Sequence, residues 1–428
     1  MVNPEGTPLF QSKKATKCDS TIAYRTWPIF LLSFTRLFFI SIFERAFLNY
    51  LYFTVDINES TLGFISSATA AAYIIGPLVG QFITSKLGIR NSIILSSIST
   101  PILMGAQMLY FDPLYLISIR ILSGISLGVY WPNCYNLLSR WQSVSNDEKS
   151  NRNFKQFNFS WNLGFILGLL FGFLWALTLN EYITMTIAFF LSFLLLPFSL
   201  FLKKDSELNH LGEKTVNIEQ YNIELNSDVN LRKVPKQKSN NHMIVYPILF
   251  SWLTLFVYAA SKSIFRFSYP VFLKSFGSPS YFAYLIQLSI QIGQLIGLTW
   301  SNSMKIYYRK VSVFTSLIMI VFSSFAIIIT QNLLYISIIS ASIGLFIGLI
   351  QGASLKIMID YGAERNTKKY STTNEVLKGI GFGLTPIFAG FVAEINIYAI
   401  FIFLIIFIFS VFIPIIYLSR NIKKKHID

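Results

Sequence analysis

The chain has 428 residues, of which 53% are hydrophobic and only 13% are charged, and its formal net charge is +15. Soluble domains carry about 25% charged residues, so a single soluble core is excluded. The positive charge is spread over short segments and forms no separate basic domain. This spread excludes nucleic acid as the partner and leaves a membrane protein.

Apolar stretches of membrane-spanning length begin after a polar tail, residues 1–26, which lacks the apolar core of a cleavable signal. We expect the first stretch to serve as an uncleaved insertion signal. Hydrocarbon offers no hydrogen-bond partners, so each stretch of about 20 residues is predicted to be a transmembrane helix. Residues 27–202 contain six of them, at 27–52, 61–83, 91–110, 114–138, 156–178 and 182–202.

A polar segment, residues 203–243, separates this first set from a second one. It has too few large apolar groups to fold, so a flexible cytoplasmic linker is predicted. Residues 244–418 then contain the second set, before a short tail at 419–428. These helices are predicted at 244–267, 280–300, 311–330, 333–357, 372–393 and 396–418.

The two sets have nearly equal length, which is typical of transporters built from a duplicated half. The predicted fold class is an all-α integral membrane protein with twelve transmembrane helices in two pseudo-symmetric six-helix bundles. Of the 35 Lys and Arg residues, 27 lie at the chain ends or in alternate connecting segments, seven lie within the predicted helices, and only Lys274 lies in the other set of connecting segments. The positive-inside rule therefore predicts cytoplasmic termini, in the plasma membrane.

Several motifs resemble those of the major facilitator superfamily over about residues 27–418. In the segment between the second and third helices, Gly88 and Arg90 match the family pattern, while Ser85 stands where the family has Asp. The fourth helix contains Arg120 followed by glycines at four-residue spacing, as in the family: Gly124 and Gly128. The fifth contains Gly164, Gly168 and Gly172, but Leu169 replaces the proline of the family's antiporters.

The resemblance implies alternating access around a central cavity, with Gly88, Arg90 and Arg120 in gating or coupling. For Arg120, a buried arginine that is hydrogen-bonded to neighbouring carbonyls is the alternative. Charged residues inside the predicted helices are the next candidates, because a charge in hydrocarbon is costly. Arg36 lies near the middle of its helix and is predicted to face substrate; a structural pair is the alternative. Arg45 projects half a turn away, so an anchor at the membrane interface is predicted for it.

Lys262 and Arg266 lie one turn apart on the seventh helix, with Tyr258 one turn before them. Two cations on one face repel each other unless a carboxylate lies nearby. Glu44 is at a similar depth, so we predict a Glu44–Arg266 or Glu44–Lys262 pair that closes the outer side. Snorkelling of both cations towards the outer surface is the alternative.

Glu375 and Lys378 are three residues apart on the eleventh helix and can satisfy each other as a pair. Alternatively, Lys378 contacts substrate while Glu375 changes protonation. Glu44 and Glu375 are the acidic candidates for proton coupling; a facilitator without coupling is the other possibility.

Polar side chains at helical spacing complete the candidate substrate site. The eighth helix presents a phenol and three amides on one face, which predicts a hydrated, substrate-facing stripe or interhelical hydrogen bonds. Its members are Tyr284, Gln287, Gln291 and Gln294. Further amides occur on the fourth, fifth and tenth helices: Asn133, Asn158, Asn162 and Gln351.

An excess of cations among amides and phenols favours an anionic or polar organic solute. We therefore predict a secondary transporter, with membrane lipid and a small-molecule substrate as partners and protons as a candidate coupling ion. A drug or metabolite exporter of the same fold and a non-transporting receptor or scaffold are the alternatives. We expect no enzyme activity, cofactor or metal, because no nucleophile–base constellation or metal-ligand set is present.

Overall fold

The structure is a computed structural model that describes residues 26–142, 147–203, 242–363, 367–420 and 423–426. Helices account for nearly all of it. The first half of the chain contains α1 (Trp27–Phe53), α2 (Glu59–Leu109), α3 (Pro113–Gln142), α4 (Asp147–Thr178), α5 (Glu181–Ser192) and α6 (Leu195–Leu200). The second half contains α8 (Ile248–Ser275), α9 (Phe282–Ser303), α10 (Tyr308–Ile328), α11 (Leu333–Ala363), α12 (Thr367–Ile395) and α13 (Ala399–Arg420).

The described residues contain eleven helical segments that are long and apolar enough to cross a membrane, with α2 counted once and α5 and α6 counted together. Helix α2 has 51 residues, and Gly88 interrupts it with a φ of 82°, so two helical arms meet there. A positive φ is accessible to glycine at no steric cost, which is why this residue type can form the kink. The predicted helices at 61–83 and 91–110 correspond to these two arms.

Several other predicted boundaries differ from the structure. The helix predicted at 156–178 begins nine residues earlier, at Asp147, the one predicted at 333–357 continues to Ala363, and the one predicted from 244 begins at Ile248. The predicted helix at 182–202 is divided into α5 and α6 by a turn at residues 193–194. The predicted end at residue 267 was wrong, because α8 continues to Ser275. Pro270 does not stop the helix, and the residues around it, from Phe267 to Leu273, are buried against neighbouring helices.

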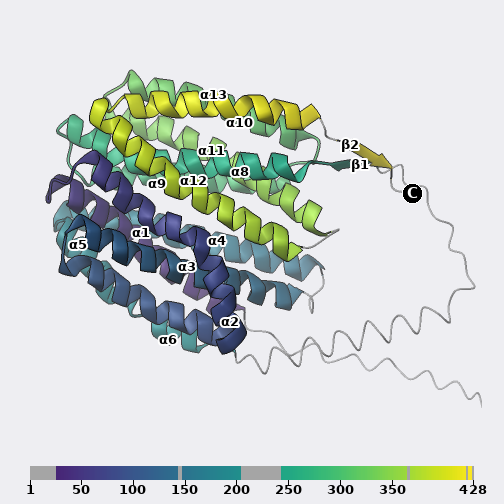
Figure 1. Ribbon diagram of the computed structural model, residues 1–428, viewed down its shortest axis with the longest axis horizontal. Helices are drawn as coiled ribbons and strands as arrows, with labels where there is room; N and C mark the ends of the chain where they lie inside the picture. Colours follow the sequence, from purple (N-terminus) through teal and green to yellow (C-terminus); the bar gives the residue numbers. More distant parts are fainter. Residues whose placement is uncertain (1–25, 143–146, 204–241, 364–366, 421–422, 427–428) are drawn as a thin grey trace, which may run out of the picture.

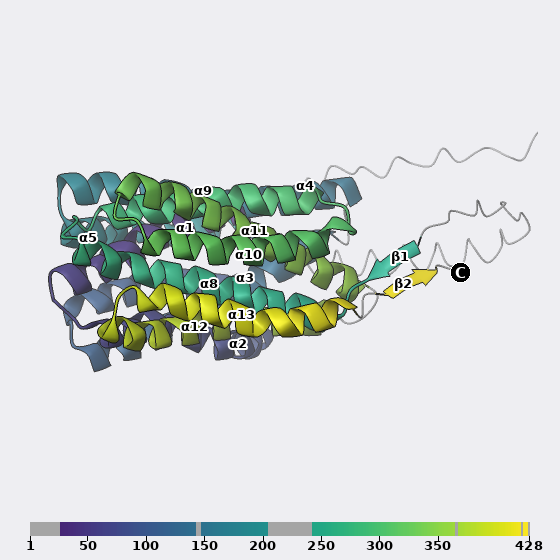
Figure 2. The same cartoon turned by 90° about the horizontal axis from the view of Figure 1, so that it is seen from above.

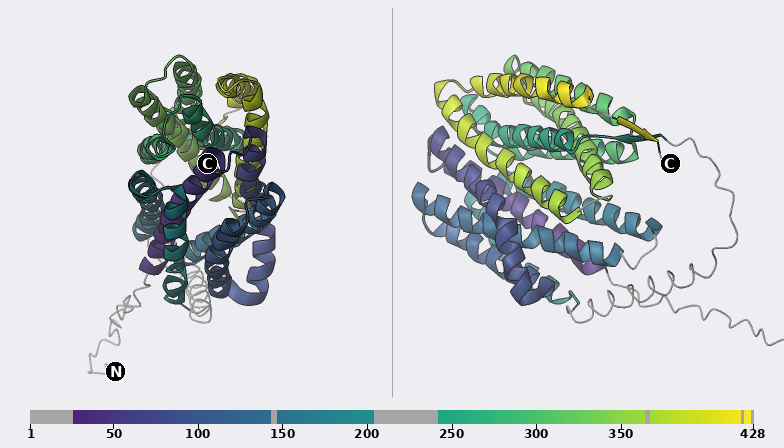
Figure 3. Two further views of the ribbon diagram at one scale, coloured as in Figure 1. Left: turned by 90° about the vertical axis from the view of Figure 1, so that its left-hand side faces the viewer. Right: turned by 45° about the vertical axis from the view of Figure 1, so that its right-hand side comes forward.

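The helices run roughly side by side, with the first half of the chain on one side and the second half on the other (Figures 1 and 3). Within the halves, α2 packs on α3, α1 on α4, and α9 on α11; across them, α2 packs on α12 and α4 on α9. One end of the molecule carries the α1–α2 and α8–α9 connections, residues 54–58 and 276–281. We call it the loop end.

A two-stranded ribbon lies at the opposite end, which we call the ribbon end (Figure 2). β1 (His242–Val245) pairs antiparallel with β2 (Lys423–His426), so the residues before α8 are joined to those after α13. The sequence predicted a linker and a tail here and no strands. The remainder of the predicted linker, residues 204–241, lies outside the described residues.

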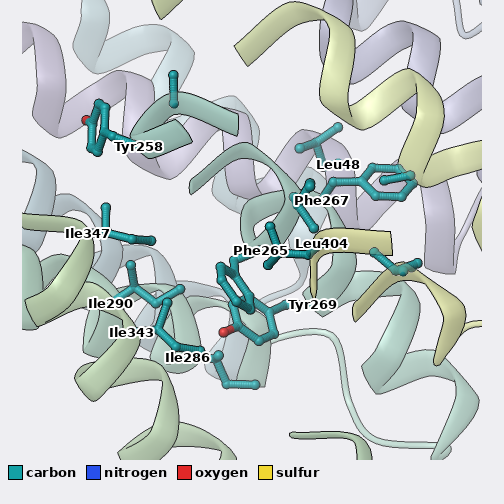
Figure 4. Close-up of a cluster of buried hydrophobic side chains, with 14 of the residues drawn as sticks. Leu48, Tyr258, Phe265, Phe267, Tyr269, Ile286, Ile290, Ile343, Ile347 and Leu404 are labelled. Atoms are coloured by element: carbon teal, nitrogen blue, oxygen red, sulfur yellow. The ribbon is translucent and has the colours of Figure 1, made fainter. Parts of the chain in front are cut away.

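Close helix packing depends on glycine, as expected where lipid provides no drive for helices to associate. A Cβ atom added to Gly128 of α3 would overlap the backbone of Gly76 on α2. In the second half, a Cβ atom on Gly344 of α11 would overlap the carbonyl of Ile290 on α9. The larger hydrophobic core joins both halves, with Leu48 of α1 near Phe267 of α8 (Figure 4).

Candidate functional site

Glu44 connects three helices near the loop end. Its Oε2 atom lies 2.7 Å from a guanidinium nitrogen of Arg120 on α3 and 3.0 Å from one of Arg266 on α8. Arg120 also donates to the side-chain oxygen of Gln107 at 3.1 Å. Of the two pairs predicted for Glu44, the structure contains the one with Arg266. This carboxylate therefore links the two halves of the chain.

Arg45, the next residue, is buried between the halves and does not anchor the protein at the membrane interface, so that prediction was wrong. Its Nε atom donates to Gln287 Oε1 at 2.6 Å, and a terminal nitrogen donates to the same oxygen. A third bond, of 3.2 Å, goes to the backbone carbonyl of Arg266. Glu44 and Arg45, which are adjacent on α1, thus form polar contacts with α8 and α9 of the second half.

Glu181 forms a second link between the halves. It is the first residue of α5, after the N-cap Asn180, whose side chain accepts from the backbone of Ile183. Its carboxylate accepts hydrogen bonds from Asn49 at 2.9 Å, Ser280 at 2.6 Å and Tyr284 at 2.8 Å. Sequence reasoning missed Glu181, because it lies in a predicted connection where carboxylates are common.

At the loop end, the α1–α2 connection contacts the second half of the chain in two places. Lys274 at the end of α8 pairs with Asp56 and donates to the carbonyl of Tyr52 at 2.8 Å. Asn58 donates to the carboxylate of Glu394 on α12 at 3.1 Å. Asp56 has a φ of 63°, a left-handed conformation that Asp tolerates better than most residues.

A cluster around Lys262 lies deeper between the halves. Its Nζ atom donates to Gln294 Oε1 at 2.6 Å and to Gln291 Oε1 at 3.2 Å. Gln294 donates to Gln351 Oε1 at 2.6 Å and to the Tyr258 hydroxyl at 3.2 Å. We call these five residues the Lys262 cluster. They come from three helices of the second half: α8, α9 and α11.

The first half reaches this cluster through α4. Gln291 donates to Asn162 Oδ1 at 2.8 Å, and the ring of Phe165 lies 5.6 Å from Lys262 Nζ. Gln291 and Gln294 are each 1% exposed. The predicted stripe on the eighth helix thus uses its amides in interhelical hydrogen bonds and does not face open water in this conformation. No described carboxylate contacts Lys262.

Glu375 and Lys378 form the predicted pair within α12, at 2.6 Å. The other oxygen of Glu375 accepts from the Tyr73 hydroxyl of α2 at 3.0 Å. The pair therefore sits at the contact between α2 and α12, where the two halves meet, and is not an isolated surface pair.

Arg36 lies apart from the Lys262 cluster, so the two predicted parts of the substrate site are not brought together. Arg36 is fully buried among helices of the first half and donates to Ser96 Oγ of α2 at 3.1 Å. Its guanidinium carbon lies 4.1 Å from the centre of the Tyr130 ring of α3. It lines a cavity of about 40 Å³ whose walls all belong to α1, α2 and α3.

The remaining candidates have local structural contacts. Asn133 exchanges hydrogen bonds with Thr84 of α2, and Asn158 accepts from Trp161 one turn away on its own helix. Arg90 donates to the carbonyls of Leu200 and Leu202, where it satisfies the C-terminal end of α6. The structure therefore does not bring Asn133 and Asn158 to the Lys262 cluster.

Comparisons with known proteins show what this arrangement is similar to. A family model described as Major Facilitator Superfamily matches residues 29–240. The nucleoside transporter NupG has a TM-score of 0.65 at 12% identity, over 92% of this chain and 99% of that chain. No curated protein matches the chain in sequence.

Two further structures of transporters share the fold. A mutant of the peptide transporter POT in complex with sulfate has a TM-score of 0.62 at 13% identity, over 93% of this chain and 95% of that one. A POT family transporter in complex with 5-aminolevulinic acid has a TM-score of 0.64 at 15% identity, over 93% and 96%. The family match, the membrane-spanning helices and the common fold show that this chain is a multi-pass membrane protein that belongs to the major facilitator superfamily.

Proposed function

We propose that this protein is a secondary transporter that moves a small anionic or polar organic solute across the plasma membrane by alternating access. One observation carries the proposal: Lys262, a cation between the halves, contacts amide oxygens but no described carboxylate. A cation in a low-dielectric site is costly unless an anion compensates it. A substrate carboxylate or phosphate would supply that anion.

The proposed architecture has twelve transmembrane helices in two six-helix bundles, residues 27–202 and 244–418. The two arms of α2 supply two spans, and α5 with α6 supplies one, which brings the first half to six. The concentration of Lys and Arg at the ribbon end supports a cytoplasmic location for both termini, with residues 203–243 as the linker. The loop end would then be the outer end.

The contacts at the loop end correspond to one of the two states that alternating access requires. Glu44, Arg45, Glu181 and Lys274 all bridge the halves there. The described conformation would therefore be closed to the outside. Opening would separate Glu44 from Arg266 while leaving Glu44 with Arg120, because the latter two belong to the same half.

The chemistry of the Lys262 cluster indicates the substrate class. Lys262 would pair with an anionic group, while Gln291, Gln294, Gln351 and the Tyr258 hydroxyl would exchange their mutual hydrogen bonds for bonds to polar groups of the solute. Related folds have been solved with sulfate and with 5-aminolevulinic acid. We place proton coupling, where it operates, on Glu375, whose contact with Tyr73 spans the halves.

Thermal unfolding of the purified full chain in detergent tests this proposal. Organic carboxylates larger than acetate, phosphate esters, neutral polar solutes and lipophilic cations would be compared for stabilisation. A ligand at a hundredfold excess over its Kd stabilises by about 2.7 kcal/mol, enough for a rise of a few degrees in Tm. We expect anionic solutes to raise the Tm of the wild type and not that of Lys262→Met.

Lys86→Met is the matched control, because it removes the same charge from an exposed position where the ammonium lies over the ring of Phe82 on its own helix. This variant should respond to anions as the wild type does. Stabilisation by lipophilic cations alone would contradict the proposal and favour export of such compounds. If the anionic solutes still raised the Tm of Lys262→Met, the Lys262 cluster would not be the substrate site.

A further inference from the structure

The cavity beside Arg36 is separate from the Lys262 cluster. Its lining residues come from α1, α2 and α3, and none of them belongs to that cluster. A cavity holds one water molecule for each 10–15 Å³ of this volume, so about 40 Å³ accommodates roughly three waters or an ion of three to four heavy atoms. Larger organic substrates do not fit.

Two of the residues that line the cavity each have a buried polar atom with no hydrogen-bond partner among the described residues. These atoms are Nε of Arg36, a donor on a fully buried guanidinium, and Oγ1 of Thr69 on α2. Leaving a buried polar atom unpaired costs about 1–3 kcal/mol, and more on a charged group. Both atoms therefore indicate a polar guest in the cavity.

The charge of Arg36 distinguishes an anion from water as the guest. The described partners of Arg36 are neutral: the hydroxyl and carbonyl of Ser96 and the ring of Tyr130. Glu44 also lines the cavity, from a backbone position eight residues, or about 12 Å of helical rise, after Arg36. Its charge is already shared by Arg120 and Arg266.

We propose that this cavity is a binding site for a small monoanion of the size of formate or nitrate, held by Arg36 with Thr69 as a second donor. The planar guanidinium suits such ions, because its N–H groups match two oxygens of a carboxylate or nitrate. The site goes beyond the proposed transport function, since it is built from one half of the chain and is too small for an organic solute.

Formate and nitrate titrations of the purified full chain, at constant ionic strength with gluconate as the balancing anion, test the site by thermal unfolding. We expect a saturable rise in Tm for the wild type. Ser123→Leu should abolish it by filling the cavity, because Ser123 lines the wall and its hydroxyl bonds only to Ile119 of its own helix. Ser118→Leu is the matched control, on the exposed face of α3.

Thr69→Val provides a second variant that keeps the shape of the side chain and breaks no described hydrogen bond. It should fold as the wild type does and raise the Kd for formate by about tenfold, the equivalent of one lost hydrogen bond. Lys262→Met should keep the formate response while losing the response to larger anions, which separates this site from the proposed transport site. No saturable response in the wild type would overturn the proposal and leave the cavity to water. Equal responses in Ser123→Leu and Ser118→Leu would also overturn it.

Discussion

Glu44 is a carboxylate with two cationic partners that differ in exposure. The Arg120 side chain is 2% exposed and belongs to the same half, whereas the Arg266 side chain is 36% exposed and belongs to the other half. A buried ion pair loses more when one partner is removed than an exposed pair, because the remaining charge is left in a low-dielectric environment. Loss of the Glu44–Arg120 pair should therefore destabilise the fold more than loss of the Glu44–Arg266 pair.

Replacement of Glu44 by Gln should lower the Tm more than replacement of Arg266 by Gln. In Glu44→Gln, Arg120 keeps its contacts with Gln107 and the Phe47 ring but loses its carboxylate, and removing one member of a buried pair costs about 3–5 kcal/mol. In Arg266→Gln, the Glu44–Arg120 pair persists, and solvent screens the lost contact. Thermal unfolding of both variants in the same detergent measures the difference; an equal loss would show that Arg120 does not depend on Glu44.

Sequence reasoning reached part of this network. The Glu44–Arg266 pair could be predicted because the two charges lie at a similar depth in the membrane. That depth follows from the position of each residue along its predicted helix. Arg45 was assigned to the wrong environment because counting gives depth but not which neighbouring helix covers a face. Its partner Gln287 is 242 residues away. The separation of Arg36 from Lys262 likewise depends on tertiary packing.

At the scale of the helices, apolar length located nearly every element, because the bilayer imposes that length on each span. One boundary that failed lies where packing within the protein takes over from lipid. At the end of α8, buried contacts extend the helix beyond the predicted residue 267. In the β1–β2 ribbon, the apolar residues Ile244 and Val245 of β1 were assigned to the start of the next helix, and the Lys-rich β2 has no strand signal, so the pairing could not be predicted.

Because α2 and α3 are in close contact, we expect a single methyl group added at Gly128 to lower the stability of the protein strongly. A Cβ atom on Gly128 would overlap the backbone of Gly76, so Gly128→Ala must push two helices apart. Overpacking costs about 1–3 kcal/mol, and we expect the upper end because backbone cannot rotate away. In Gly105→Ala the added atom meets the ring of Phe189, which can move, and alanine favours the helix by up to about 1 kcal/mol.

Folded yield and Tm of the two alanine variants, measured by size-exclusion chromatography and thermal unfolding, test this contrast. Gly128→Ala should lose several degrees and Gly105→Ala should stay close to the wild type. Similar values for both variants would show that α2 and α3 can separate at little cost. The glycine spacing on the fourth predicted helix would then have no packing role.

For the whole molecule, the described contacts divide into those within a half and those between halves. Glycine packing and buried apolar groups hold α2 to α3 and α9 to α11. Several links between the halves at the loop end are polar contacts of exposed or half-buried side chains, such as Lys274 with Asp56 and Asn58 with Glu394. Exposed ion pairs contribute about 0–1 kcal/mol, so these links can break without unfolding either half.

Electron–electron distance measurements on spin-labelled cysteines therefore provide a test of rocking that needs no known substrate. A label pair at Thr54 and Ser275 joins the exposed ends of α1 and α8, and a pair at Thr54 and Tyr110 stays within the first half. We expect two distance populations for the first pair and one for the second. Asp56→Asn, which neutralises the partner of Lys274, should enlarge the longer population of the first pair severalfold, because an ion pair worth about 1 kcal/mol shifts a two-state equilibrium about fivefold. A single, unchanged distance for both pairs, with and without that substitution, would show that the halves do not move at the loop end and would contradict alternating access.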